Sequence, residues 1–242
     1  MSFQNTRYVV VGAAGGIGSA LSRQLVSRGG EVVLIGRSAE RLAPLAAELL
    51  APAYALDAAS FEPLEQAIAA AGPIHGIVNC AGSLLLKPAH LTTEAEFQQT
   101  LHANLTTAFA TVRAGAKALS AAGGSIVLCA TAAARTGFAN HEAIAAAKGG
   151  VIGLTLSAAA TYAPRNIRVN CVAPGLVATP LAARITSNEA ALKASTAMHA
   201  LGRIGRPEDV ASAIAFLLDP ENSWTTGQIL GIDGGLGSIR PR

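Results

Sequence analysis

Short runs rich in valine and isoleucine alternate with longer segments whose apolar residues recur at helical spacing. The short runs are apolar enough to be strands buried on both faces of a sheet. The predicted strands are residues 8–11, 31–35, 54–56, 74–79, 125–130, 167–172 and 228–232. The predicted helices are residues 18–28, 39–50, 61–70, 94–119, 144–162 and 207–218. This alternation predicts repeated βαβ units, hence an α/β fold in which a doubly wound parallel sheet of seven strands carries helices on both faces.

One connection interrupts this alternation. Between Pro174 and Arg206 a long segment replaces the usual short turn, and connections of that length in compact domains commonly act as lids or binding segments. We therefore expect residues 176–205 to form the substrate side of a site. The length of 242 residues suits one domain, residues 1–242, with a full hydrophobic core.

Composition narrows the function classes. The net charge of +3 is spread along the chain without a cluster of Lys and Arg, so we do not expect a nucleic-acid partner. Cys80, Cys129 and Cys171 lie apart in apolar runs without Cys-x-x-Cys spacing, which favours reduced, buried thiols in a cytoplasmic protein and no metal site. The first residues lack a basic stretch followed by an apolar core, so neither secretion nor a membrane span is expected.

A glycine-rich turn joins the first predicted strand to the first helix. Gly12-Ala13-Ala14-Gly15-Gly16-Ile17-Gly18 allows a tight turn and lets backbone N–H groups approach a pyrophosphate, as in a Rossmann-type dinucleotide fold. After the second strand stands Arg37, where an NAD-preferring fold more often has an acidic residue. An arginine there can pair with a 2′-phosphate, which favours NADP(H) over NAD(H).

Together with further motifs, the turn makes the whole chain similar to the classical short-chain dehydrogenase/reductase family. Gly12, Gly16 and Gly18 match the family's Thr-Gly-x-x-x-Gly-x-Gly turn, with Val11 in the threonine place. The other matches are Asp57, Asn79-Cys80-Ala81-Gly82, Asn104, Ile167-Arg168-Val169-Asn170, Pro174-Gly175 to Thr179, Gly205 to Val210 and Asp233-Gly234-Gly235. The cofactor site implied by the turn, by Arg37 and by the resemblance is Gly12, Gly16, Ile17, Gly18, Arg37, Asp57, Asn79, Ala81, Gly82, Lys148, Pro174, Gly175 and Thr179.

The family's catalytic tetrad of Asn, Ser, Tyr and Lys falls here on Asn104, Thr131, Ile144 and Lys148. Thr131 keeps a hydroxyl that can donate to a carbonyl oxygen. In the family, the tyrosine protonates the alkoxide that forms as hydride arrives, and an isoleucine has no such proton. The chain therefore resembles an atypical member that lacks the catalytic tyrosine.

A replacement proton donor must come from groups near the same helix start. His141 is the sharper candidate, because histidine titrates near neutral pH, although a lone histidine before a helix is more often a solvated or capping residue. Glu142 is adequately explained by the preference for acidic residues in a first helical turn. Lys148 can relay a proton through water to Thr131, although holding the nicotinamide ribose already accounts for it.

Three interpretations stay open. The first is an NADP(H)-dependent oxidoreductase acting on a small apolar carbonyl or alcohol substrate, with water, His141 or Lys148 as proton source. The second is a catalytically silent cofactor-binding or partner subunit, and the third is a non-redox enzyme on the same scaffold. The resemblance also implies a homodimer or homotetramer formed by the helices at 94–119 and 144–162 and by the C-terminal strand and helix. Apolar residues expected to line the pocket are Leu84, Leu85, Leu86, Phe138, Ile144 and the segment 176–201.

Overall fold

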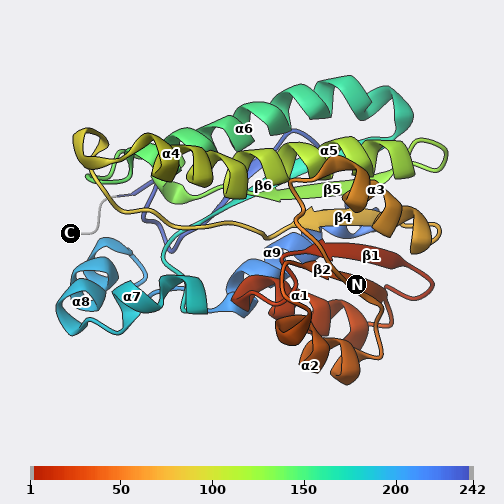
Figure 1. Ribbon diagram of the computed structural model, residues 1–242, viewed down its shortest axis with the longest axis horizontal. Coiled ribbons are helices and arrows are strands. Elements are labelled where there is room, and N and C mark those ends of the chain that lie inside the picture. Colours follow the sequence, from red (N-terminus) through yellow and green to blue (C-terminus); the bar gives the residue numbers. More distant parts are fainter. Residues whose placement is uncertain (1–2, 240–242) are drawn as a thin grey trace.

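The computed structural model describes residues 3–239, and its strands form one sheet in which every neighbouring pair is parallel (Figure 1). The spatial order is β3-β2-β1-β4-β5-β6-β7. The strands are β1 (Arg7–Val11), β2 (Glu31–Gly36), β3 (Ala53–Ala55), β4 (Gly76–Asn79), β5 (Gly124–Cys129), β6 (Ile167–Pro174) and β7 (Ile229–Ile232). The predicted seven-stranded doubly wound sheet is confirmed, with boundaries shifted by one or two residues.

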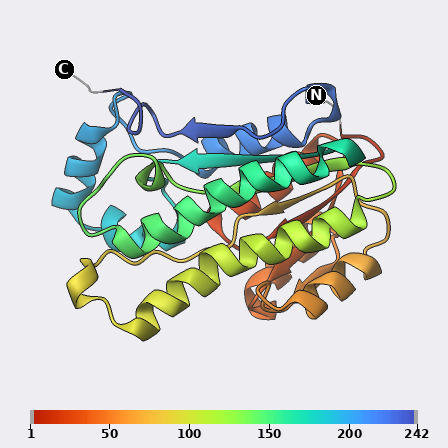
Figure 2. The ribbon, with the colours of Figure 1, turned by 90° about the horizontal axis from the view of Figure 1, so that it is seen from above.

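Helices cover both faces of this sheet (Figures 1 and 2). One face carries α3 (Phe61–Ala70), α4 (Glu94–Leu101), α5 (Thr107–Ala118) and α6 (Glu142–Tyr162). The opposite face carries α1 (Gly16–Ser27), α2 (Ala39–Leu49) and α9 (Pro207–Leu218). Figure 2 shows α5 and α6 side by side above the strands, where they contact each other.

The alternation of side chains along the strands explains this three-layer arrangement. On β1, Val9 and Val11 join the apolar layer beneath α3, α5 and α6. Tyr8 and Val10, between them in sequence, join the layer that packs on α1, α2 and α9. Both faces of the strand are therefore buried, which is why the sequence reads as a continuous apolar run rather than an alternating one.

The helix predicted at 94–119 is not one continuous α-helix. It is α4, then a π-helical segment His102–Thr106, then α5. A π segment inserts an extra residue into the turn, and such segments occur frequently at functional sites. Here it contains Asn104, so the helix departs from regularity at a predicted site residue.

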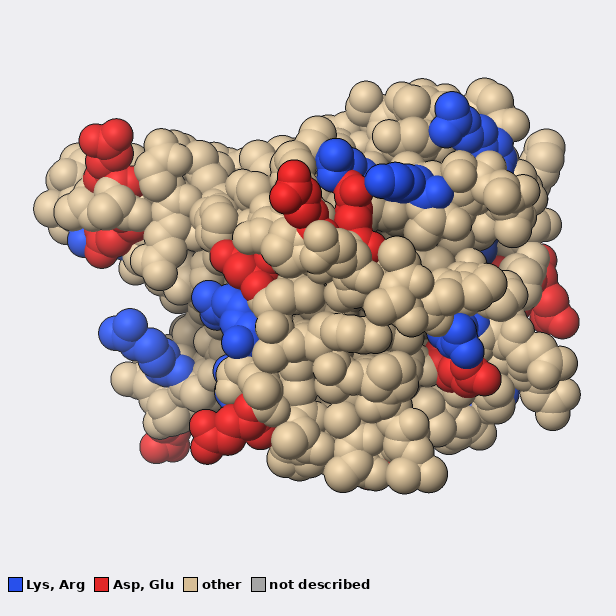
Figure 3. Space-filling view, turned by 45° about the vertical axis from the view of Figure 1, so that its right-hand side comes forward, with Lys and Arg blue, Asp and Glu red and all other residues tan. Residues whose placement is uncertain are grey.

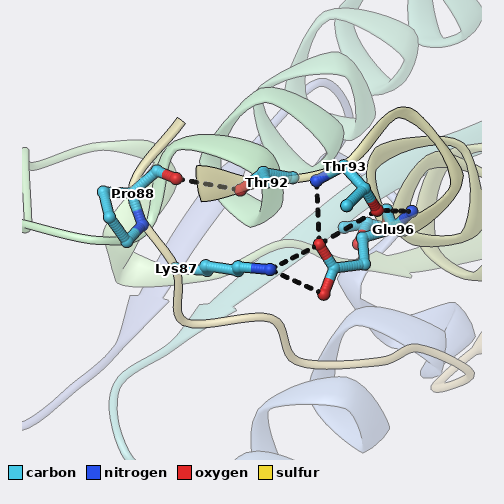
Figure 4. A network of polar contacts seen from close by, with 6 residues as sticks. Lys87, Pro88, Thr92, Thr93 and Glu96 are labelled. Carbon is cyan, nitrogen blue, oxygen red and sulfur yellow. Dashed lines mark hydrogen bonds and ion pairs between the residues drawn. The ribbon is translucent and has the colours of Figure 1, made fainter. Parts of the chain in front are cut away.

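A polar network fixes the start of α4 (Figure 4). The Thr93 hydroxyl accepts from the Glu96 backbone N–H, and the Glu96 carboxylate accepts from the Thr93 N–H at 2.8 Å, which forms a capping box. The Lys87 ammonium donates to both oxygens of Glu96 and, with Thr93, lowers the pKa of that carboxyl to about 2. The segment between β4 and α4 is thereby tied to the helix that leads to Asn104.

The segment predicted to be a long substrate-side connection contains two helices, α7 (Ala183–Thr186) and α8 (Glu189–Met198). Both lie beyond the carboxyl ends of the strands (Figure 1). None of the residues of α8 is fully buried, and the chain after it is held by buried His199. The His199 Nδ1–H donates to Ser195 O at 2.7 Å, and its Nε2 accepts from the Leu176 N–H at 3.2 Å.

The segment Glu142–Arg165 is long and apolar enough to cross a membrane by composition alone. It contains α6, which packs on β6 and contributes Val151 and Ala158 to the core, so its apolar character is explained by burial on the sheet. On the face shown in Figure 3, Lys and Arg are interspersed with Asp and Glu and separated by uncharged residues.

Candidate active site

The glycine turn after β1 is shaped by close backbone approaches. Gly12 has φ +79°, and a Cβ added there would lie 2.5 Å from the Ala81 nitrogen. A Cβ on Gly18 would lie 2.4 Å from Gly12 O, and one on Gly16 would lie 2.6 Å from the Thr179 side chain. The turn therefore has contacts with the segments after β4 and after β6, which lie at the same edge of the sheet. Only glycine allows these approaches.

Helix α1 starts directly at this turn. Its N-cap is Gly15, which offers no side-chain acceptor to the first N–H groups of the helix. Uncapped N–H groups at a helix N-terminus form an anion site, and the small residues of the turn leave the backbone open to a bulky phosphate. The local structure thus fits the pyrophosphate of a dinucleotide.

The turn after β4 is held by two buried asparagines. Asn79 Oδ1 accepts from the Ala81 N–H at 2.8 Å, and its Nδ2 donates to Thr111 Oγ1 at 3.1 Å. Asn104 Nδ2 donates to Ser83 Oγ at 3.0 Å and to Thr100 O at 2.9 Å, while its Oδ1 accepts from the Ser83 N–H. A Cβ on Gly82 would lie 2.7 Å from Asn104 Oδ1, so this glycine permits the asparagine to approach.

At the other end of the predicted cofactor site, Asp57 pairs with a residue that sequence analysis missed. Its Oδ2 lies 2.9 Å from His102 Nε2, and its Oδ1 accepts from the Ala59 N–H at 3.0 Å. Burial raises the pKa of the Asp57 carboxyl, but these contacts and the charge of Arg37 outweigh it and leave the pKa lowered. Arg37 itself is exposed, and nearby Arg41 reaches toward Ala14 O at 3.5 Å.

Lys148 extends from α6 toward the end of β5. Its side chain is buried, and its Nζ donates to Cys129 O at 2.7 Å. Burial lowers the pKa of this ammonium, and the neighbouring thiols of Cys129, Cys171 and Cys80 oppose that effect. The lysine is thus fixed by a backbone carbonyl rather than by a carboxylate.

The four residues predicted for the tetrad positions all line one cavity of about 260 Å³. Thr131 Oγ1 accepts from the Ala133 N–H at 3.3 Å and lies 3.5 Å from Pro174 O, so its own hydrogen has only a weak partner. Ile144 is buried, with 3% of its surface exposed. Residues of the predicted sites that line this cavity are Ile17, Ala81, Gly82, Asn104, Thr131, His141, Lys148, Pro174, Gly175 and Thr179.

The other predicted cofactor residues, Gly12, Gly16, Gly18, Arg37, Asp57 and Asn79, are not part of that lining. The lining also includes residues outside the predicted sites and outside the segment 176–201, among them Cys80, Ser83 and Cys129. Cys80 directly follows β4 and Cys129 ends β5, so the position after a buried strand was the signal that could have identified them.

The two donor candidates before α6 differ in position. His141 lines the cavity, and its Nδ1 lies 2.8 Å from Ala139 O, so that Nδ1 carries the hydrogen and Nε2 is left for a ligand. Glu142 is exposed and lines a separate surface hollow with Ala89 and Phe97. Of this pair, only the histidine shares the cavity with Thr131 and Lys148.

Three apolar side chains, Leu84, Phe138 and Ile144, line the same cavity, as predicted. From the segment 176–201 it receives Leu176, Val177, Leu181, Ala182 and Met198. The described lining has no Asp, Glu or Arg. Leu85 and Leu86 are not part of the lining, so the expectation for these two residues is wrong.

Comparisons with known proteins agree along the chain. A family model described as enoyl-(acyl carrier protein) reductase matches residues 12–237. The L-xylulose reductase of Bos taurus is 33% identical over 232 residues, covering 95% of each chain. The galactitol 2-dehydrogenase (L-tagatose-forming) of Cereibacter sphaeroides is 35% identical over 237 residues, covering 93% of this chain and 92% of the other.

Solved structures are also similar. A short-chain type dehydrogenase/reductase from Mycobacterium ulcerans has a TM-score of 0.95 and 29% identity, covering 100% of this chain and 93% of the other. A putative NAD(P)-dependent gluconate 5-dehydrogenase from Beutenbergia cavernae, solved with NADP bound at low occupancy, has a TM-score of 0.93 and 31% identity. It covers 98% of this chain and 99% of the other.

Proposed function

The chain belongs to the short-chain dehydrogenase/reductase family, and on that basis we propose that it is an NADP(H)-dependent oxidoreductase whose proton donor is His141. Its substrate is a small apolar carbonyl compound or the corresponding alcohol. The observation that carries this proposal is the meeting of His141, Thr131 and Lys148 at one cavity, around an isoleucine in the family's tyrosine place.

The proposed cofactor site uses backbone groups at one end and charged side chains at the other. The N–H groups at the start of α1 hold the pyrophosphate, as the glycine approaches around Gly12 and the uncapped helix end allow. Arg37 binds the 2′-phosphate, with Arg41 one helical turn further along as a second cation. Asp57 contacts the adenine, and its partner His102 orients the carboxylate. When bound, the nicotinamide supplies or accepts the hydride.

The chain's own residues then handle the substrate oxygen. Thr131 donates its hydroxyl hydrogen to the carbonyl oxygen and stabilises the charge that develops there. Lys148 holds the nicotinamide ribose, since its ammonium has three hydrogens and only one is used by Cys129 O. Asn104 uses both Nδ2 hydrogens inside the protein, so it keeps the turn after β4 in shape rather than acting on the substrate.

His141 delivers the proton in this scheme. With Nδ1–H donating to Ala139 O, a proton taken up from solvent sits on Nε2, and it is this proton that passes to the alkoxide oxygen. The contact between the rings of His141 and Phe138, whose centroids lie 5.6 Å apart, restrains the imidazole at the cavity. Such general acid catalysis contributes about 100-fold or more to the rate.

The substrate class follows from the lining. Leu84, Phe138, Leu181 and Met198 offer apolar surface, the described lining has no Asp, Glu or Arg, and its Lys148 is assigned to the nicotinamide ribose. A ketone or aldehyde with an apolar body fits such a cavity better than a sugar acid. An activated carbonyl is favoured, because its dispersed oxyanion charge needs less protonic help.

The proposal includes a cytoplasmic homodimer or homotetramer. Phe109 on α5 and Leu156 on α6 are 49% and 51% exposed, which supports burial of these helices against a second copy. Trp224 and Leu230 are 100% and 38% exposed near the C-terminal strand and support a second contact there. Light scattering after size exclusion measures the mass of the assembly directly.

The test is NADPH consumption with a panel of apolar activated carbonyls. The native protein, His141→Ala, Ile144→Tyr and the matched control His90→Ala, an exposed histidine outside the cavity, are compared under the same conditions. We expect turnover by the native protein, a loss of about 100-fold in His141→Ala together with a changed pH profile of the rate, and no change in His90→Ala.

Other outcomes separate the alternatives. Equal rates and pH profiles for the native protein and His141→Ala would remove the histidine from the proton path. Turnover by Ile144→Tyr alone would show a competent scaffold in a chain that has lost this chemistry. NADPH binding without consumption in either protein would favour a silent cofactor-binding subunit.

A further inference from the structure

Two thiols meet at the carboxyl ends of neighbouring strands. Asn79 of β4 is paired in register with Leu128 of β5, so the next residues, Cys80 and Cys129, stand opposite each other. Their Sγ atoms lie 4.0 Å apart, in hydrogen-bond contact. The expectation that all three cysteines are isolated and buried is therefore wrong for two of them, which are half-buried and in contact.

The geometry allows the two sulfurs to bond. Neighbouring strands run about 4.8 Å apart, which lies within the range of about 4.4 to 6.8 Å that disulfides span between Cα atoms. The sulfur atoms must approach by about 2 Å to reach the bond length. Rotation of the two side chains, together with a small shift of the strand ends, provides that movement, because both cysteines lie at or beyond the last paired residues of their strands.

The surroundings of the pair distinguish the two thiols. The Cys80 thiol and the charge of Lys148 lower the pKa of Cys129 against the opposing effect of burial. The contact with Cys129 and burial raise the pKa of Cys80. Cys129 is therefore the thiolate former and nucleophile, and Cys80 is the partner that keeps its proton.

An oxidation site must also be accessible to the oxidant. Cys80 and Cys129 are half-buried and both line the 260 Å³ cavity, so the pair lies in the wall that a small molecule entering the cavity contacts. Cys171, the remaining cysteine of the chain, has no exposed surface, and burial raises its pKa to about 12. It is absent from the cavity lining and provides a built-in unreactive reference.

We propose that Cys80 and Cys129 form an oxidation site for small hydroperoxides, which convert the pair into an intramolecular disulfide. The Cys129 thiolate attacks one peroxide oxygen, the O–O bond breaks, and the released hydroxide, or alkoxide for an alkyl hydroperoxide, takes up the proton lost by the thiol, giving a sulfenic acid and water or an alcohol. The Cys80 sulfur then attacks the sulfenic sulfur, and the hydroxyl leaves with the Cys80 proton as water. The sulfurs lose two electrons together, and the peroxide gains two.

The disulfide has a consequence for the site, which rests on the proposed function. Drawing the ends of β4 and β5 together moves the Cys129 carbonyl that holds Lys148 Nζ, and it moves the turn at Ala81 against Gly12. Both belong to the proposed cofactor site. Oxidation therefore weakens NADPH binding, and a dithiol reductant restores it.

The first experiment tests the thiols without reference to activity. The full-length protein, Cys80→Ala, Cys129→Ala and the matched control Cys171→Ala are treated with hydrogen peroxide, alkylated and mapped by peptide mass spectrometry. We expect a cross-link between the peptides of Cys80 and Cys129, with loss of two hydrogen atoms, in the native protein and in Cys171→Ala, reversed by dithiothreitol. Cys80→Ala stops at a sulfenic acid on Cys129, and Cys129→Ala gives no cross-link.

Absence of the cross-link in the native protein, or faster oxidation of Cys171 than of this pair, overturns the proposal. Serine variants at both positions repeat the test should an alanine variant fold poorly, as judged by circular dichroism. A second arm adds NADPH before peroxide. A cross-link that forms equally fast with NADPH bound contradicts the placement of the cofactor and leaves the oxidation site intact, so the two proposals fail separately.

Discussion

Replacing Gly12 by alanine tests whether the first turn is fixed by backbone contact with the segment after β4. Gly12 has φ +79°, in the left-handed region. An added Cβ would lie 2.5 Å from the Ala81 nitrogen and 2.7 Å from the Cys80 carbonyl carbon. Because both are backbone atoms, rotation of a side chain cannot relieve the contact. The ends of β1 and β4, which hydrogen-bond through Cys80 N and Val11 O at 2.8 Å, must separate.

The magnitude follows from two effects. A left-handed conformation costs a residue with a Cβ about 1–2 kcal/mol. Forcing a methyl into filled space costs about 1–3 kcal/mol more. The sum of about 2–5 kcal/mol does not exceed the usual stability of a domain, about 5–15 kcal/mol. We therefore expect Gly12→Ala to fold, with a lower urea midpoint and much weaker NADPH binding, since Ala81 and the glycine turn belong to the same proposed site.

The same turn supplies a matched control. Gly15 has φ −79° and ψ 166°, which alanine adopts freely, and a Cβ there meets only Gly12 O at 3.2 Å. Gly15→Ala should change the free energy of unfolding by less than about 1 kcal/mol. Urea unfolding followed by circular dichroism measures both variants, and fluorescence titration measures NADPH affinity. Equal stability of the two variants would refute the reasoning from backbone contact.

Three further substitutions test single side chains. Arg37→Asp should lower NADPH affinity about 10-fold or more and leave NADH affinity unchanged, and equal losses for both cofactors in a fluorescence titration would contradict the 2′-phosphate role. Arg168→Leu should destabilise the fold by about 3 kcal/mol in urea, because the buried guanidinium donates to carbonyls at the end of α9. Asp209→Asn should cost about 1 kcal/mol at neutral pH, since the ion pair with Arg203 and a backbone N–H lower the pKa of Asp209 from 3.8 to about 2. Thermal melts should then show the native advantage above pH 4 and its loss as the pH falls toward 2, and a difference that persists there would be inconsistent with this ion pair.

The sheet could be predicted because each strand is recognisable from its own short run of apolar residues. Residues 32–35 of β2 are all buried and all apolar, and such a run is visible in the sequence whatever its neighbours are. Helix α3 was predicted with its observed bounds, Phe61–Ala70, since its amphipathic pattern is complete in ten residues. The apolar pattern of a single segment is therefore enough to predict which of its residues are buried against the sheet.

The break in the helix before α5 could not be predicted in the same way. Residues His102–Thr106 continue the apolar spacing of α4 and contain no Gly or Pro that would break an α-helix. The π segment goes with a tertiary contact, because Asn104 reaches Ser83 in the turn after β4. A contact between residues 21 positions apart is not visible in a helical period. The contact between the Cys80 and Cys129 thiols could not be predicted for the same reason. These residues are 49 positions apart and are brought together by the register of β4 and β5.

At the start of α6, two contributions to function can be distinguished. The fold fixes the backbone geometry, whereas a single side chain must provide the proton. Asn140 takes a left-handed φ of 63°, the helix begins at Glu142, and His141 stays outside it as the N-cap residue. Ile144, which we propose occupies the family's donor position, lies in the first helical turn, two residues inside the observed start. Cofactor binding depends largely on backbone N–H groups and glycines, which tolerate sequence change as long as the turns persist. Proton transfer depends on one side chain. Membership of the family therefore supports the proposed cofactor site more directly than it supports the proposed proton transfer. Variants of His141 are needed to measure that proton transfer.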